Sequence, residues 1–177
     1  FMKKDHDLAQ AYQAIDRLHE AGLIYDAHIM TGVAGKGRGM ENAEALAQFL
    51  NRTNPAHVVN FSMFLHKEVP LYQDIRQGTF VPADELETIR EEYHLIERIA
   101  PEKAGANILY DGFHDFIHVR VRGHLPGDKE KMLAKLNGII QEYEGKEPVY
   151  SFVQGECPDL EYCDDGKAVW DMDRKTS

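Results

Sequence analysis

The segment 32–39 carries the residues best suited to hold a ligand, and it reads GVAGKGRG. Its four glycines would let the backbone approach a ligand closely, and Lys36 and Arg38 add positive charge. Where such a segment joins a strand to a helix, backbone N–H groups favour anions. It is not a P-loop, because Gly37 rather than Ser or Thr follows the lysine, and its glycine spacing differs from that of a dinucleotide-binding turn. Two interpretations stay open, an anion or cofactor site and a plain tight turn.

Histidines and cysteines form a second group of candidate ligands. His114, His118 and His124 would lie close together if 113–121 is a strand, and two ring nitrogens at that spacing can share a metal ion. A polar sheet face would explain these histidines equally well. Cys157 and Cys163 have a C-x5-C spacing, longer than structural zinc sites prefer, and no second cysteine pair completes four ligands. We therefore predict no metal site in this chain and two unligated thiols.

Helical and extended segments alternate along the chain, and they would position these residues. Apolar spacing predicts helices over 8–18, 43–50, 82–99 and 126–143, and strands over 23–31, 57–65, 113–121 and 148–153. The first two strands are almost continuously apolar, as expected for parallel strands buried on both faces. Helices and strands joined by short loops are typical of parallel βα units. Beyond residue 155 the chain is acidic and has little pattern, so we expect a loose tail.

The composition indicates the broad class of protein. The 177 residues are 43% hydrophobic and 28% charged, as in a globular α/β domain with a real core. A net charge of -10 argues against nucleic acid or an anionic membrane as the partner, since both favour a basic surface. No apolar run is long enough to span a bilayer, and the first residues lack the apolar region of a signal peptide. The sequence thus predicts a cytoplasmic protein with no nucleic-acid and no membrane partner, and the resemblance described next implies a small-molecule substrate.

Several short motifs occur in an order that resembles one enzyme superfamily. They are LHEAG at 18–22, IMTGVAG at 29–35, NP at 54–55, HVVNFSMF at 57–64, PLY at 70–72 and GTF at 78–80, followed by an acidic helix. RGHLPGDK at 122–129 resembles the region that follows the barrel in some members. Together these segments resemble radical S-adenosylmethionine (radical SAM) enzymes, in the group of Fe–S oxidoreductases similar to oxygen-independent coproporphyrinogen III oxidase. The resemblance covers most of the chain and is specific to the superfamily rather than to one reaction.

The resemblance implies an α/β fold, namely the second half of a partial (β/α) TIM-like barrel with a C-terminal α+β extension. Residues 1–100 would form the barrel half, 101–155 the extension and 156–177 an acidic tail. It also implies two cofactors in the full-length protein. One is a [4Fe–4S] cluster held by three thiolates of a C-x3-C-x2-C loop, and the other is S-adenosylmethionine, which the cluster cleaves to a 5′-deoxyadenosyl radical.

The resemblance also suggests cofactor-binding residues at the ends of the first two strands, and it suggests no catalytic residue in this chain. The set is His28, Met30, Gly32, Gly35, Lys36, Arg38 and Phe64. The strand end at His28 and Met30 would form a wall for the adenosine, and Phe64 would contact the adenine edge through its backbone. Lys36 and Arg38 are placed near the methionine carboxylate on charge and position alone.

The chain departs from the family in one decisive respect. It has no C-x3-C-x2-C loop, and in the family that loop precedes the segment that matches this chain. We therefore expect a fragment of a longer radical enzyme, inactive by itself, whose partner would be the missing N-terminal half of the barrel. Exposed strand edges and apolar surface would favour self-association of the fragment. The alternatives are a (β/α) enzyme that binds a phosphorylated small molecule at residues 32–39, and a non-enzymatic metal- or partner-binding domain.

Overall fold

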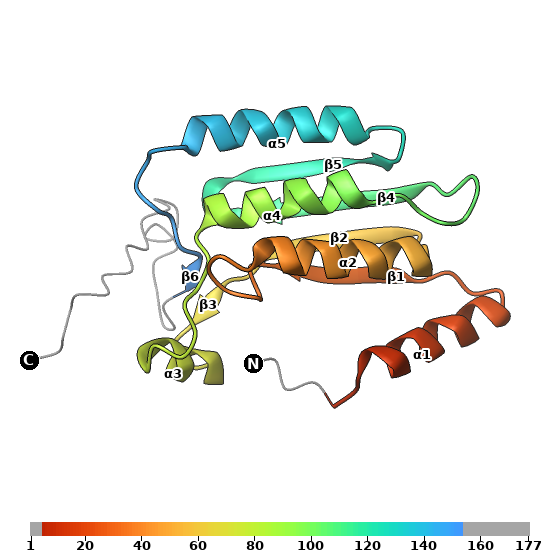
Figure 1. The fold of residues 1–177 in the computed structure, drawn as a ribbon, viewed down its shortest axis with the longest axis horizontal. Helices are drawn as coiled ribbons and strands as arrows, with labels where there is room; N and C mark the ends of the chain where they lie inside the picture. Colours follow the sequence, from red (N-terminus) through yellow and green to blue (C-terminus); the bar gives the residue numbers. More distant parts are fainter. Residues whose placement is uncertain (1–4, 154–177) are drawn as a thin grey trace, which may run out of the picture.

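The fold is built around one four-stranded mixed sheet, and the computed structural model describes residues 5–153. The strands are β1 (Asp26–Thr31), β2 (His57–Ser62), β4 (Ile108–His114) and β5 (Val119–Leu125). They lie in the order β1-β2-β4-β5, with the first three parallel and β5 antiparallel to β4 (Figure 1). The predicted α/β fold class is therefore confirmed.

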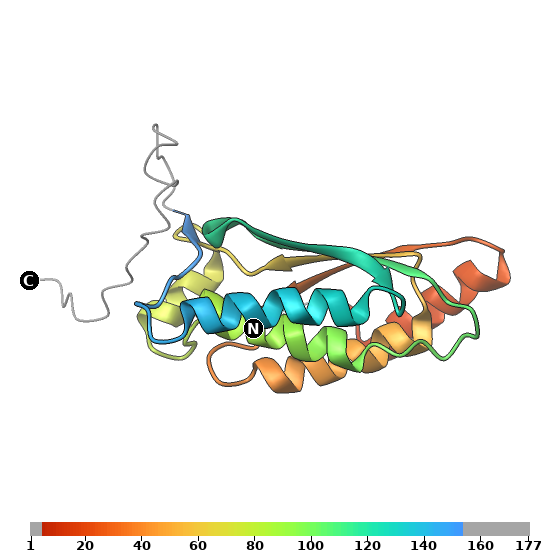
Figure 2. The same ribbon diagram turned by 90° about the horizontal axis from the view of Figure 1, so that it is seen from above.

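Three long helices cover one face of this sheet. They are α2 (Gly39–Thr53), α4 (Glu85–Arg98) and α5 (Lys129–Tyr143), and Figure 2 shows all three on the same side of the strands. A further helix, α1 (Leu8–Glu20), lies near the amino end of β1 (Figure 1). Its first turn is fixed by a capping box, in which the Asp7 side chain accepts the Gln10 N–H and the Gln10 side chain accepts the Asp7 N–H, both at 2.8 Å.

Shorter elements gather at the carboxyl ends of the parallel strands. β3 (Leu65–His66) pairs in parallel with β6 (Phe152–Val153), and α3 (Pro70–Arg76) follows β3 in the chain. Figure 1 shows these elements at the same end of the molecule. A small apolar cluster holds them in place; it consists of Met63, Leu65, Ile75 and Phe80.

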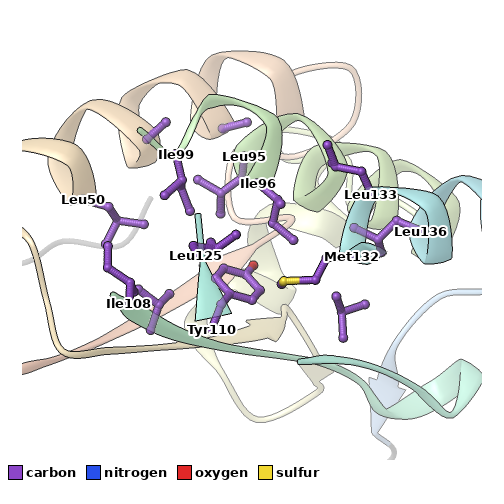
Figure 3. Packing of buried hydrophobic residues seen from close by; sticks show 14 of the residues in the cluster. Leu50, Leu95, Ile96, Ile99, Ile108, Tyr110, Leu125, Met132, Leu133 and Leu136 are labelled. Atoms are coloured by element: carbon purple, nitrogen blue, oxygen red, sulfur yellow. The ribbon is translucent and has the colours of Figure 1, made fainter. Parts of the chain in front are cut away.

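The main core lies between the sheet and the three covering helices. Figure 3 shows part of this cluster, which includes Leu50, Ile96, Tyr110, Leu125 and Leu136, and each of these side chains is fully buried. They come from α2, α4, β4, β5 and α5, so the core joins all three helices to the sheet. Burial of such apolar side chains is the dominant favourable contribution to folding, at about 25 cal/mol per Å².

The opposite face of the sheet has no covering helix within the described part of the chain, and its side chains are exposed or partly exposed apart from the buried Asp111. Successive strand residues alternate between the two faces, and Ala27, Val58, Tyr110 and Val121 belong to the core. The residues that alternate with them form what we call the open face: Asp26, His28, Met30, His57, Val59, Phe61, Leu109, Asp111, Phe113, Arg120, Arg122 and His124. Parallel strands are ordinarily buried on both faces, so a bare face is unusual.

One predicted strand is wrong, and the other predicted strands are longer than the corresponding strands in the structure. Instead of one strand over 113–121, β4 ends at His114, a short 3-10 helix (Asp115–Ile117) follows, and β5 begins at Val119. His118 has a positive φ of 53°, which reverses the chain at this point. The predicted strands 23–31, 57–65 and 148–153 shorten to Asp26–Thr31, to β2 with the separate β3, and to β6.

The proposed division of the chain near residue 100 falls within this layered structure. β4 and β5, from the expected extension, pair into the same sheet as β1 and β2. The acidic tail at 156–177, with Cys157 and Cys163, lies outside the described residues.

None of the helices within residues 5–153 is long and apolar enough to cross a lipid bilayer.

Candidate functional site at the carboxyl ends of the strands

The glycine-rich segment 32–39 begins where β1 ends and turns toward the helix-covered side of the sheet. Gly32 and Gly35 have φ of 84° and 82°, which side-chain-bearing residues rarely adopt. A Cβ at Gly35 would lie 2.8 Å from the Val81 carbonyl oxygen, so only glycine fits. The Lys36 N–H donates to the same carbonyl at 2.8 Å. These contacts fix the segment against the chain that precedes α4.

A buried carboxylate on α4 anchors the start of this segment. Glu91 is 2% exposed; its Oε2 accepts the Gly32 N–H at 3.0 Å and its Oε1 accepts Asn42 Nδ2 at 2.5 Å. Burial raises the pKa of Glu91 to about 7, although the bonds from Asn42 and Gly32 act in the opposite direction. The link between β1 and α2 thus depends on a group that titrates near neutral pH.

Replacing Glu91 with glutamine is expected to change how stability depends on pH. The native pKa of about 7 lies above the ordinary value of 4.5, so the native state binds more protons than the unfolded state between these values. Stability should therefore fall as pH rises from about 4.5 to about 7, by up to about 3 kcal/mol. Glu91→Gln should remove this fall, because a glutamine stays neutral and can still accept the Gly32 N–H. Urea unfolding at pH 5 and pH 8 would measure the free energy of unfolding of the original protein and of Glu91→Gln. An equal fall in stability in the two proteins would contradict the raised pKa of Glu91.

The structure separates the predicted cofactor-binding residues into two groups. His28 and Met30 belong to the open face, whereas the segment that holds Lys36 and Arg38 lies beside α4 on the covered side. Arg38 is paired with Glu41 at 2.8 Å on the surface of α2. The two cations are therefore not brought together with His28 and Met30. Phe64 follows the end of β2 and is 56% exposed.

The contacts of segment 32–39 also bear on its capacity to bind an anion. The amides of Gly32, Gly35, Lys36 and Arg38 all donate within the protein. The acceptor at Gly32 is itself the carboxylate of Glu91. A phosphate approaching that amide would meet a negative charge whenever Glu91 is ionised, so the geometry favours the tight-turn interpretation here.

Aromatic and charged side chains form a continuous row across the open face. His28 and Phe61 have ring centroids 6.4 Å apart, and Phe61 stacks on Phe113 at 5.5 Å with planes 16° apart. The Arg120 guanidinium lies over Phe113, 4.7 Å from the ring centroid. The row therefore runs from β1 through β2 and β4 to β5 and offers planar rings that a ligand could stack against.

The position of Arg120 is set by a buried carboxylate. Asp111 is 4% exposed and accepts from Arg120 Nε at 2.8 Å and Nη2 at 2.6 Å, a bidentate pair. Hydrogen bonding to Arg120 lowers the pKa of Asp111, and Arg122, whose Nε lies 3.7 Å from Asp111 Oδ2, adds to the effect. Asp111 thus stays ionised, and it orients one guanidinium while a second lies nearby.

Behind the strand ends, on the covered side, lies a buried ionic network. His114 Nδ1 contacts Glu85 Oε2 and its Nε2 contacts Glu92 Oε2, both at 3.0 Å. All three side chains are at most 2% exposed. Carboxylates only accept, so both ring nitrogens donate and His114 is an imidazolium.

Further hydrogen bonds connect this network to the strands. Glu92 Oε1 accepts Asn60 Nδ2 at 3.0 Å and the Tyr110 hydroxyl at 2.9 Å. Glu85 Oε1 accepts the hydroxyls of Ser62, at 3.2 Å, and of Ser151. The network thereby joins α4, β2, β4 and the segment before β6, and it fixes the relative positions of the strand ends.

The coupling between these groups shifts their pKa values in opposite directions. Burial by itself would lower the pKa of His114, but the charges of Glu92 and Glu85 and the bonds to both raise it to about 10. Burial would raise the pKa of Glu92, yet the charge of His114 and the bonds from His114, Asn60 and Tyr110 lower it. Burial and the charge of Glu92 raise the pKa of Tyr110 well above its ordinary value. Near neutral pH the network therefore holds the charged Glu92 carboxylate against a charged His114 imidazolium.

The network was not predicted from the sequence, and the histidines do not form a metal site. Glu85, Glu91 and Glu92 belong to the helix predicted over 82–99, and charged residues of an amphipathic helix are normally solvated. The spacing of Glu85 and Glu92 could have indicated their burial. Positions 85 and 92 lie on the same face of the helix as the buried Ile89 and Ile96. Within residues 5–153 no group of three His, Cys, Asp or Glu side chains could hold a metal ion.

The comparisons with known proteins add nothing to this geometry. Searches of protein-family models, of curated proteins and of solved structures find no significant match to the chain, so its function has to be inferred from the residues described above.

Proposed function

We propose that this chain supplies part of a (β/α) barrel of the radical SAM type and binds the nucleoside half of S-adenosylmethionine on the open face, near the carboxyl ends of β1 and β2. The observation that carries the proposal is that, within residues 5–153, the three parallel strands β1, β2 and β4 have helices on one face only. In a closed barrel the uncovered face is the interior, and ligands bind at the carboxyl ends of the strands. The motif resemblance supports the same placement.

The free edge of β1 is consistent with a neighbouring strand. The Thr31 carbonyl accepts the Met63 N–H at 2.9 Å, so backbone groups at 27, 29 and 31 point toward β2. The backbone N–H and C=O groups of the alternate residues, which include His28 and Met30, point away from β2, toward the free edge of the sheet. A further parallel strand beside β1 would extend the sheet in the direction in which a barrel closes.

The residues fit the two cofactors unequally. His28 and Met30 offer a ring and a thioether at the strand edge, and the exposed Phe64 ring lies after the end of β2, which suits a nucleoside. The described residues do not fit a [4Fe–4S] cluster, and the only two cysteines of the chain, Cys157 and Cys163, have the wrong spacing. Under this proposal the cluster, which supplies the electron for cleavage of the cofactor, is held by residues outside these 177.

Saturation-transfer NMR with S-adenosylmethionine tests the binding claim directly. We expect transfer to the adenine protons, reduced at least about fivefold by His28→Ala through loss of a stacking contact. Ile24→Ala is the matched control, because Ile24 is 83% exposed near the amino end of β1. Absence of transfer, or an equal effect of Ile24→Ala, would refute the proposal. The coding sequence upstream of Phe1 provides a second test. A C-x3-C-x2-C loop encoded there would support the proposal, and an upstream sequence without that loop would refute it.

A further inference from the structure

The free edge of β5 has an accumulation of positive charge that the proposed function does not use. A pocket of about 420 Å³ lies between this edge and α5, lined by Arg120, Val121, Arg122, Lys131, Met132 and Lys135. Each charged side chain among these lining residues is cationic. The chain as a whole has a net charge of -10, so this concentration of cations runs against its overall composition.

Grouping these cations has an energetic cost unless something offsets it. Arg120 and Arg122 are two residues apart on one strand, so their side chains leave the same face. Lys131 and Lys135 are four apart on α5, where like charges repel. Arg120 and Arg122 share the single carboxylate of Asp111, which neutralises one of the four positive charges. Three positive charges therefore remain around the pocket. An anion of two or three charges would offset them.

Protection of the sheet edge explains only part of the arrangement. Lys135 Nζ donates to the Arg120 carbonyl at 2.5 Å, and Asp128 Oδ2 accepts the His124 N–H at 2.8 Å. Both contacts occupy outward-facing backbone groups of β5, as expected where strand addition is to be prevented. They do not account for Arg122, which is 56% exposed, or for the exposed Lys131.

The pocket is also partly organised before any ligand arrives. The buried Asp111 carboxylate holds Arg120 through Nε and Nη2 on top of Phe113, and Nη1 carries two more N–H donors. A guanidinium that is already oriented loses little entropy when it binds an oxyanion. The volume is within the range of small-ligand sites.

We propose that the β5–α5 pocket binds a small oligoanion, a ligand with at least two phosphoryl or carboxylate groups, through Arg120, Arg122 and Lys131. Charge-assisted hydrogen bonds to such oxygens are short and strong, and Arg120, Arg122 and Lys131 all line this pocket. This inference is independent of the proposed nucleoside site, because it concerns the opposite edge of the sheet from β1.

Isothermal titration of the 177-residue chain with tripolyphosphate and with citrate, in low and in physiological salt, tests the proposal. We expect saturable one-to-one binding that weakens about tenfold for Arg122→Gln and again for Lys131→Gln. It should also weaken as salt rises, because added ions screen the charges. The stronger of the two anions identifies phosphoryl or carboxylate chemistry. Neither substitution removes a buried group, so both proteins should stay folded.

Arg76→Gln is the matched control, since it removes one exposed positive charge from α3 and should leave the affinity unchanged. Three outcomes would overturn the proposal. One is no binding of either anion at millimolar concentration. Another is an equal loss in Arg76→Gln, which would show non-specific attraction. The third is tighter binding of an acidic peptide or a single-stranded oligonucleotide than of either small anion, which would identify a macromolecular partner.

Discussion

Replacing His114 with leucine is expected to destabilise the protein by about 3–5 kcal/mol at pH 7, because the change leaves two buried carboxylates without a cation. His114 is fully buried, and its ring nitrogens contact Glu85 and Glu92 at 3.0 Å. Leucine has a similar volume, so loss of packing contributes little. Urea unfolding followed by circular dichroism would measure the difference, with His94→Leu, a partly exposed position on α4, as the control.

The loss should be recovered in part when the opposing charge is removed as well. In the His114→Leu background, Glu92→Gln would take away one uncompensated charge while its amide oxygen can still accept from Tyr110. We expect the double variant to be more stable than His114→Leu alone. If the loss of unfolding free energy in the double variant equals the sum of the losses in the two single variants, the two groups do not act as a pair.

The sign of the pH dependence follows from the shifted pKa values. The pKa of His114 is raised from 6.5 to about 10, so its stabilising charge is fully present below about 6.5 and is lost as pH rises through about 10. The pKa of Glu92 is lowered, so its contribution is present above 4.5 and is lost as pH falls below that value. The effect of His114→Leu should therefore be largest near neutral pH and shrink toward both extremes.

Much of the fold could be predicted because apolar spacing depends on local sequence. The helices near 43–50, 82–99 and 126–143 and the first two strands occur close to where their periodicity places them. β4 was not predicted as a separate strand, and the Asp-Gly dipeptide at 111–112 within it is of a type that is common in turns. Their neighbours in space, Arg120 and Glu92, come from other elements, and only the folded chain brings them together.

The candidate site was harder to predict than the fold for a related reason. Glycine content identified segment 32–39, but its orientation is fixed by Glu91 and Val81, which lie far along the chain. A charged residue on an amphipathic helix is normally solvated, and three glutamates of α4 are instead buried. Burial of such groups requires partners from several strands, and single-sequence spacing does not reveal those partners.

A glycine of β4 provides the other large effect, because Glu92 fills the space where its side chain would be. Gly112→Ala is expected to destabilise the protein by about 4 kcal/mol, which combines overpacking with disruption of a buried ion pair. A Cβ at Gly112 would overlap the Glu92 carboxylate and lie 3.2 Å from the Tyr110 ring. Glu92 would have to leave the positions in which it accepts from Asn60, Tyr110 and His114.

Gly138→Ala is the matched control for this prediction, since both changes add one methyl group at a glycine. Gly138 lies within α5, and a Cβ there would meet no atom within 4 Å. Alanine is the better helix former, so this substitution should stabilise the protein by about 0.5–1 kcal/mol. If urea titrations show a loss of stability for Gly112→Ala and a gain for Gly138→Ala, the Gly112 effect is due to displacement of Glu92 and not to the added methyl group itself. A loss under 1 kcal/mol for Gly112→Ala would mean that the carboxylate can move at little cost, and the network would then not fix the ends of the strands.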